Sequence, residues 1–322
     1  MATQSIQVNT NSSGEISAVS SDVNVATATI NGKSVVVDPR GPGECNLIIS
    51  IGEDPNYTTP NPVVCKIKVK RPEEYNGEEI KQIVQAGQGL ARFRVGDRWP
   101  VKMKGRVGIL DIDGTYYVAL IGLNHNQSVE TQGKPNAHFK FPYDQDGKQL
   151  AFCDSEYNML GEGPGFRMNP GASPSNVGGW EKSYALNTLS PQILNILEES
   201  WRNAISDCVK YTDNVGNATG SIAANVTPTT QKIFYLSQWE VFADETYTNT
   251  YEKDYQKQYA YYANGNNKVH YRHDQPTIAV WVWERSPYAT DSTIFRVIYS
   301  SGAIGSGNAR YSGGAAPAFS IH

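Results

Sequence analysis

Short apolar runs alternate with polar turn residues along residues 1–71. Within the runs, apolar side chains fall at every second position, as expected for strands that bury one face. Gly, Pro, Asn and Asp are frequent between the runs and mark turns. This spacing predicts an all-β antiparallel sandwich. The expected strands cover residues 6–8, 15–19, 23–26, 34–37, 45–51 and 63–69.

A polar linker follows at residues 72–79, and we expect the second domain to span residues 80–322. Residues 80–84 have an apolar spacing that fits either a strand or a short helix. The apolar residues at 93–97 and 101–103 predict strands. The second domain is therefore expected to begin with short elements.

Two longer apolar runs, at residues 107–112 and 115–123, flank the dipeptide Asp113-Gly114. This dipeptide accepts the positive φ of a tight two-residue turn. The pattern therefore predicts a β-hairpin that turns at Asp113-Gly114.

Residues 124–179 are polar and rich in Gly and Pro, with few periodic runs, which indicates either a long functional loop or elements that the pattern conceals. Helical spacing returns at residues 190–208. Ser190-Pro191 forms an expected cap and first turn there. Apolar residues then recur at intervals of three and four on one face: Ile193, Leu194, Leu197, Trp201, Ile205 and Cys208.

Four tyrosines at intervals of four would form one stripe if residues 246–271 were helical. Tyrosine can pack with its hydroxyl in water or stack on a ligand. Packing is favoured because amphipathic periodicity mostly reports burial, and ligand stacking is the alternative. The stripe comprises Tyr247, Tyr251, Tyr255 and Tyr259.

The carboxyl-terminal residues have the most apolar pattern of the chain. Runs at residues 279–283 and 294–299 predict two strands, and residues 316–321 close the chain. Because termini fray unless they join a sheet, we expect this ending to be part of the core. A Gly-, Ser- and Asn-rich loop at residues 300–314 is expected to be free to touch a partner.

The composition narrows the class of protein. Charged residues make up 19% of the 322 residues and the formal net charge is −4, so no basic footprint for nucleic acid is visible. The 19 tyrosines favour strands and polar loops over a helical bundle. The four cysteines are too scattered for a disulfide scaffold or a metal motif. Cys45 and Cys65 are expected to face the core as thiols, with a disulfide as the less favoured alternative.

The first residues lack a basic segment followed by an apolar run, and no run approaches the ~18 apolar residues of a membrane span. We therefore expect synthesis in a cytoplasm without a cleaved signal, and no membrane insertion.

Motifs that carry catalytic chemistry are absent from the sequence: there is no GxSxG, HExxH or Walker loop. His270, His273 and Asp274 could bind a metal, but an exposed polar loop is favoured because a closed site needs more ligands. Asp144 begins an acidic segment that fits a structural turn better than a calcium loop. His125 lies at the end of an expected strand, a position that suits a functional group. No cofactor is expected.

The amino-terminal pattern resembles a bacterial immunoglobulin-like domain of the group 2 kind. The resemblance rests on residues 20–28, Gly32 with residues 35–37, residues 41–49, Asn56-Tyr57 and the final Val-rich strand. Such modules usually act as spacers or decorations on phage particles and bacterial surface proteins. The resemblance implies that role here.

Residues 80–321 resemble an uncharacterised domain family common in phage structural proteins and in proteins of Gram-positive bacteria, and more weakly a C-type-lectin-like fold. The family usually closes on Gly-Val-Arg-Pro-Ala-Phe, whereas this chain has alanine at the arginine position, Ala316. No catalytic residues are agreed for the family. The resemblance is carried by residues 93–97, 178–183, 232–242, 283–287 and 317–319.

Together these features predict two domains, an all-β immunoglobulin-like sandwich and an α+β C-type-lectin-like domain. The expected function is that of a non-enzymatic phage virion surface protein, a fibre, tail or capsid decoration that displays the second domain to a host-surface glycan. A purely structural virion component and a carbohydrate-active hydrolase are the alternatives. Expected partners are other virion proteins and further copies of the chain, located in the virion. The candidate binding residues are Tyr288, Asn308, Tyr311, Tyr262 and His125.

Overall fold

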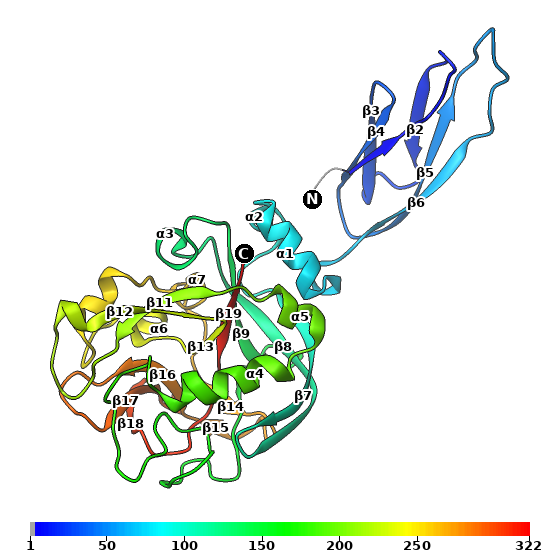
Figure 1. Ribbon diagram of the computed structural model, residues 1–322. Coiled ribbons are helices and arrows are strands. Elements are labelled where there is room, and N and C mark those ends of the chain that lie inside the picture. Colours follow the sequence, from blue (N-terminus) through cyan, green and yellow to red (C-terminus); the bar gives the residue numbers. More distant parts are fainter. Residues whose placement is uncertain (1–3) are drawn as a thin grey trace. The chain divides into compact units, whose positions relative to one another are not determined.

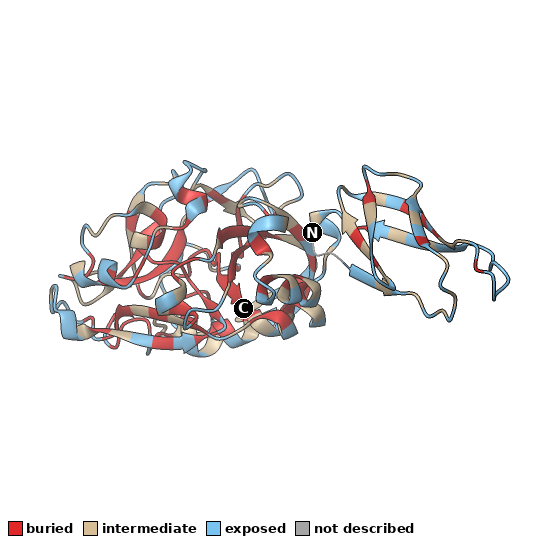
Figure 2. Ribbon diagram, turned by 90° about the horizontal axis from the view of Figure 1, so that it is seen from above, coloured by how far each residue is buried: buried red, intermediate tan, exposed pale blue. Residues whose placement is uncertain are grey.

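The computed structural model describes residues 4–322. The chain forms two compact, β-rich units that divide between Tyr75 and Asn76 (Figure 1). The division lies within residues 72–79. Along strands of the first unit buried and exposed residues alternate, whereas whole strands of the second unit are buried (Figure 2).

The first unit is a sandwich of two three-stranded sheets around an apolar core. The expected strand at residues 23–26 is wrong, because Val25 and Ala26 donate backbone hydrogen bonds to Asp22 O in a turn. Cys45 is buried, Cys65 packs against the same core, and both are free thiols. The sheets have the orders β1 (Gln4–Gln7), β4 (Ser34–Pro39), β3 (Ala26–Asn31) and β2 (Ile16–Ser20), β5 (Gly43–Ile51), β6 (Val63–Val69).

Residues 72–79 are more structured than a linker. They contain a 3-10 turn, η1 (Pro72–Glu74), and the start of helix α1 (Gly77–Gln85). The Asn76 side chain accepts from Glu79 N at 3.0 Å while the Glu79 carboxylate accepts from Asn76 N, a capping box that starts the helix. Residues 80–84, which fitted a strand or a helix, are therefore helical.

A five-stranded sheet forms the centre of the second unit. The carboxyl-terminal strand β19 lies between β13 and β9, and all four of its residues are buried. The expectation that the chain ends inside the core is therefore confirmed (Figure 1). The sheet order is β13 (Ile233–Phe234), β19 (Ala318–Ile321), β9 (Ala137–Tyr143), β8 (Leu110–Leu123), β7 (Arg98–Val107).

The expected hairpin turn at Asp113-Gly114 is wrong. The turn lies at Gly108, because Val107 pairs with Leu110 and Asp113 pairs with Lys104 inside the ladder. Gly108 has a φ of 58°, and a Cβ there would lie 2.2 Å from Pro164 O. The turn thus forms at Gly108, where close packing excludes a side chain, and not at Asp113-Gly114, although that dipeptide has the better local turn chemistry.

The segment 93–97, expected to be a strand, is a turn after helix α2 (Gly89–Arg92). Its geometry is held by the Asp97 carboxylate, which accepts from Arg94 N at 2.8 Å. This local side-chain bond competes with strand pairing.

The expected loop at residues 124–179 conceals helix α3 (Gln127–Glu130) and strands β9 and β10 (Leu150–Ala151). Strand β9 is buried along its whole length, including His138 and Lys140. Its polar side chains interrupt the apolar periodicity by which strands are predicted. The groups that pair with these side chains come from distant parts of the chain.

The single helix expected at residues 190–208 is divided. Leu197 has an extended ψ of 142° and separates the two helical pieces, and Cys208 begins a strand. Ser190 is not a cap, because its hydroxyl donates to Ala185 O within a helical run. The elements are the π-helical turn η2 (Ala185–Leu189), α4 (Ser190–Ile196), α5 (Glu199–Ala204), β11 (Cys208–Asp213), η3 (Ala223–Asn225) and β12 (Val226–Gln231).

The tyrosine stripe expected at residues 246–271 does not form. Tyr247, Tyr251 and Tyr255 are exposed, whereas Tyr259 is completely buried. The segment instead holds short elements at different orientations: η4 (Thr250–Asp254), α7 (Ala260–Ala263) and β14 (His270–Arg272), preceded by α6 (Gln238–Phe242).

The remaining strands form a two-stranded sheet, β11-β12, and two three-stranded sheets, β10-β14-β15 and β16-β17-β18. The expected loop at residues 300–314 contains β18, and Ser312, Gly313 and Gly314 are buried, so these three residues are not free to touch a partner. No helix within residues 4–322 has the length and apolarity needed to cross a bilayer. The strands are β15 (Ala279–Val280), β16 (Val282–Pro287), β17 (Ile294–Ile298) and β18 (Ile304–Asn308).

Candidate functional site

A network of charged side chains lies inside the second unit, around Lys210 on β11. Its Nζ donates to Glu130 Oε2 at 2.5 Å, to Glu240 Oε1 at 2.9 Å and to the Tyr259 hydroxyl at 2.9 Å. All four residues are buried. Burial lowers the pKa of Lys210, but the two carboxylates outweigh it and raise the pKa above its ordinary value. Lys210 is therefore a buried cation.

Arg285 on β16 supplies the second cation of the network. Its guanidinium donates to both oxygens of Glu240 and to Tyr235 O. Burial raises the pKa of Glu240, but Arg285 and then Lys210 reverse the shift and lower the pKa to about 2. Two cations thus face the carboxylates of Glu130 and Glu240.

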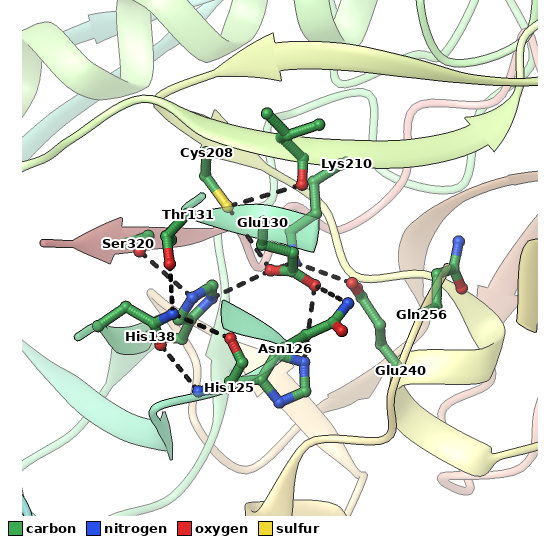
Figure 3. Close-up of polar contacts among 12 residues, drawn as sticks. His125, Asn126, Glu130, Thr131, His138, Cys208, Lys210, Glu240, Gln256 and Ser320 are labelled. Atoms are coloured by element: carbon green, nitrogen blue, oxygen red, sulfur yellow. Dashed lines mark hydrogen bonds and ion pairs between the residues drawn. The ribbon is translucent and has the colours of Figure 1, made fainter. Parts of the chain in front are cut away.

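Glu130 lies between this ion cluster and a group of softer ligands (Figure 3). One potential ligand atom each from Glu130, His138 and Cys208 falls within 4.8 Å of the others, a spacing that could hold a metal ion. The Lys210 ammonium already binds the Glu130 carboxylate, and burial raises the pKa of Cys208 so that it stays a thiol. A metal ion would have to displace the ammonium, so these residues fit a charge-balanced structural cluster better than a metal centre.

The interior network also reaches the surface loops through Glu252. Its carboxylate accepts from Asp213 N at 2.9 Å and from the Ser286 hydroxyl at 2.7 Å, which ties η4 to β11 and β16. Burial raises the pKa of Glu252 to about 7.

Two stacked tyrosines, the exposed Tyr247 and the half-buried Tyr288, and the buried Arg296 beside them form what we call the tyrosine platform. The two rings stack with centroids 5.1 Å apart and planes 15° apart. The Arg296 guanidinium carbon lies 5.5 Å from the Tyr247 centroid and 5.2 Å from that of Tyr288. Tyr247 is 57% exposed, so the platform presents an aromatic surface to solvent.

The platform is held in place from below. Tyr247 has a φ of 65°, which is rare for a bulky residue, and Ala289 N donates to its carbonyl at 2.8 Å. Gln238 on α6 accepts from Arg296 Nε at 2.6 Å and donates to Thr246 O at 2.9 Å. The strained backbone at Tyr247 is thus fixed by neighbours on both sides, a pattern found at binding sites.

Three candidate binding residues from the sequence meet at one end of the β16-β17-β18 sheet. Tyr288 N donates to Ile294 O at 3.0 Å, and Ile294 pairs with Asn308 across the ladder. Tyr311 N donates to Asn308 O at 2.9 Å in the next turn. Tyr288, Asn308 and Tyr311 are half-buried, which leaves part of each side chain accessible.

The other two candidates, Tyr262 and His125, lie in the interior. His125 stacks on Tyr259 with centroids 3.9 Å apart, and burial, followed by Lys210, lowers its pKa to about 3. The Tyr262 hydroxyl donates to Gln149 Oε1 at 3.3 Å. The structure thus does not bring these two residues to the end of the sheet where the other three meet.

His270 and His273, which the sequence offered as possible metal ligands, lie in different environments. His270 is fully buried and contacts Lys140, whereas His273 is partly buried next to Asp274, with Nδ1 3.8 Å from the carboxylate. The expected exposed loop is wrong for His270, which is buried and begins strand β14, whereas Asp274 is exposed in a bend after that strand. The expected turn at Asp144 is confirmed, since its Oδ1 accepts from Asp146 N and Lys148 N.

Sequence reasoning missed the interior network. Its members lie far apart in the chain and have no motif spacing. The available signal was a single charge within an apolar or aromatic run, as at Lys140 and Lys210. Such a charge is rarely buried unless it is paired, so each one indicated a distant partner.

An open groove of about 330 Å³ lies between α4 and β12, with Leu186, Pro191, Leu194 and Ile233 among its lining residues. None of the five candidate binding residues lines it.

Residues 166–322 match the model of a family described as a domain of unknown function, DUF6273. The matched region includes the tyrosine platform, Lys210 and Arg285, but Glu130 and Lys140 precede it. No curated protein and no solved structure matches the chain.

Proposed function

We propose that the protein is a non-enzymatic surface protein of phage virions, a fibre, tail or capsid decoration, and that its second unit binds a host-surface glycan at the tyrosine platform. In this proposal the first unit is an immunoglobulin-like spacer and the second an α+β, C-type-lectin-like domain. The resemblances of residues 1–71 and 80–321 support the virion assignment.

The single observation that carries the binding proposal is the preorganised stack of Tyr247 on Tyr288. The faces of a sugar ring bear C–H groups, which pack on an aromatic face while the hydroxyls of tyrosine and sugar exchange hydrogen bonds. Tyrosine has few rotatable bonds, so little conformational entropy is lost on binding. The exposed ring of Tyr247 has the shape and chemistry for this contact.

The charged groups of the interior support a non-enzymatic role. General acid–base chemistry needs a proton donor or acceptor within reach of substrate. Glu130, Glu240 and Lys210 instead hold one another in a buried cluster. Their arrangement suits stability and the support of surface loops.

The test is glycan binding by matched alanine variants. Tyr288→Ala and Tyr247→Ala remove the platform, and we expect each to lower binding to host polysaccharides at least tenfold on a glycan array, about 1.4 kcal/mol. Tyr311→Ala tests the neighbouring turn, and Tyr251→Ala is the control because Tyr251 is also exposed, at 41%, but lies outside the platform. Unchanged binding by the platform variants, or no binding of the wild type to any host polysaccharide, would refute the proposal.

A purely structural virion role is the second candidate, and one surface of the first unit favours it. Val19 pairs with Ile48 and Ile48 with Val64 across the β2-β5-β6 sheet, and the three side chains are 63%, 39% and 57% exposed. Exposed apolar rows of this kind often mark interfaces. On this alternative the purified chain forms a defined oligomer through that row, and Val19→Lys with Val64→Lys dissociates it in light scattering. A wild-type monomer that never co-purifies with particles argues against this alternative.

A further inference from the structure

A second buried cluster, around Lys140 on β9, is arranged for covalent chemistry. Lys140 Nζ lies 3.3 Å from Gln149 Oε1 and 2.5 Å from His270 Nε2. The three residues are no more than 3% exposed. We propose that Lys140 and Gln149 join through an intramolecular isopeptide bond that the folded chain forms by itself.

The fold brings the two residues together within a short stretch of chain. Strand β9 ends at Tyr143, the Asp144 turn reverses the direction, and Tyr143 pairs with Gln149 in an antiparallel bridge. Strand β10 then pairs with β14, which begins at His270. The nucleophile, the carboxamide and the imidazole are thus fixed by paired strands, as positioning for a reaction requires.

The Gln149 carboxamide is polarised as an acyl group must be. Its Oε1 receives hydrogen bonds from the Tyr143 hydroxyl at 3.4 Å and the Tyr262 hydroxyl at 3.3 Å. Its Nε2 donates to Asn267 O, which fixes the orientation of the amide plane. Burial raises the pKa of both tyrosines well above the ordinary value, so both remain donors. Donors that converge on one carbonyl oxygen stabilise the negative charge that develops there during acyl transfer.

The Lys140 amine has the properties of a nucleophile. Burial lowers its pKa to about 7, so near neutral pH much of it is uncharged. Lys210 is the internal contrast, since it is equally buried but two carboxylates raise its pKa and keep it cationic. An uncharged lysine is the form that attacks a carbonyl carbon.

The reaction balances without a cofactor. Lys140 Nζ forms a bond to Gln149 Cδ, and the bond from Cδ to Nε2 breaks. His270 is neutral, because burial, followed by Lys140, lowers its pKa, and its Nε2 can take a proton from Nζ. That proton ends on the departing nitrogen, which leaves as ammonia. Nothing is oxidised or reduced.

This inference is independent of glycan binding. The bond would link β9 of the central sheet to the segment that enters the β10-β14-β15 sheet. It would also survive denaturation, which makes it measurable on the unfolded protein.

The decisive measurement is the intact mass of the freshly purified full chain. We expect a mass lower by one ammonia than the sequence requires. Trypsin does not cleave after an acylated lysine, so one digest peptide should run through Lys140 to Lys148 and carry the peptide that begins at Gln149 as a branch. An intact mass equal to the sequence mass, in protein that is folded by circular dichroism, overturns the proposal.

Peptide mapping distinguishes the isopeptide bond from other reactions that lower the mass of the chain. Asn-Gly sequences also release ammonia when they form a succinimide, and the chain has three, at Asn31, Asn76 and Asn264. Ammonia loss that maps to any of these instead of the Lys140 branch overturns the assignment. Loss of water instead of ammonia would indicate a lysine–carboxylate amide, such as Lys210 with Glu130, and would equally overturn it.

Variants identify the roles. Lys140→Arg and Gln149→Leu should both restore the full sequence mass. Lys148→Arg is the matched control, because this exposed lysine neighbours Gln149 in sequence and its replacement should leave the ammonia loss complete. His270→Ala should leave a measurable fraction of unlinked chain that declines with incubation time, and a fully linked His270→Ala protein would remove His270 from the mechanism.

Discussion

Arg285 donates through Nη1 and Nη2 to the two carboxylate oxygens of Glu240, at 2.5 and 3.0 Å, and both side chains are completely inaccessible to solvent. The pair joins β16, which ends one residue before Tyr288, to α6, which carries the supporting residue Gln238. A buried charge without a partner costs free energy. Replacing either residue therefore leaves the other as a buried charge with less compensation. The ion pair is therefore part of what holds the platform in place.

Replacing Arg285 tests this relationship. We expect Arg285→Met to lower the free energy of unfolding of the second unit by about 3–5 kcal/mol, because Glu240 stays buried with less compensation. Urea denaturation measures the change. Arg106→Met is the control, since its pair with Asp111 is exposed at 3.4 Å and should cost less than about 1 kcal/mol. Equal effects of the two substitutions would contradict a structural role for the buried pair.

The buried Glu284 predicts that the folded protein loses stability as the pH rises. Both of its oxygens are buried without a hydrogen bond to any group of residues 4–322, and burial raises its pKa to about 8. A carboxyl group whose folded pKa is raised stabilises the fold fully below its unfolded pKa, ordinarily 4.5, and that contribution is lost as pH rises through 8. The loss is at most about 1.4 kcal/mol per pH unit.

We therefore expect the free energy of unfolding of Glu284→Gln, relative to that of the wild type, to be higher at pH 8 than at pH 5. Urea unfolding at both pH values measures it. Glu181→Gln is the control because Glu181 is exposed. A difference between Glu284→Gln and wild type that does not change with pH would show that Glu284 is not the group responsible.

Tyr247 allows binding to be separated from stability. Its φ of 65° costs a non-glycine residue roughly 1–2 kcal/mol, and glycine would relieve that strain. The lost stack with Tyr288 is worth about 0.5–1.5 kcal/mol, so the two effects nearly cancel. Tyr247→Gly should therefore abolish glycan binding with a melting temperature within a few degrees of wild type. A large drop in melting temperature would identify Tyr247 as a structural residue instead.

Glycine substitutions test where the long hairpin turns. Gly108→Ala meets both a positive φ and a backbone oxygen 2.2 Å away, so it should lose about 1 kcal/mol for the backbone and about 1–3 kcal/mol more for the clash. Gly133→Ala has the positive φ but open space, and should show only the backbone cost. Gly114→Ala, inside the ladder with its nearest contact at 3.5 Å, should be tolerated. A larger loss of stability for Gly114→Ala than for Gly108→Ala would indicate that the hairpin turns at Asp113-Gly114.

Local patterns in the sequence were sufficient for elements whose signal is local. Alternation of apolar residues indicated most strands of the first unit. The apolar ending at residues 316–321 was correctly expected to be core, because a strand this apolar must be covered. In each case the physical cause acts over a few neighbouring residues.

The tertiary structure alone decided the placement of polar residues and the candidate site. Strand β9 was concealed because Lys140 and His138 meet partners such as His270 and Tyr259 that lie far along the chain. Tyr288 was chosen from the sequence, but only folding places Tyr247 against its ring. Burial of a charge or the stacking of two rings depends on groups that converge in space, and no local spacing encodes that convergence.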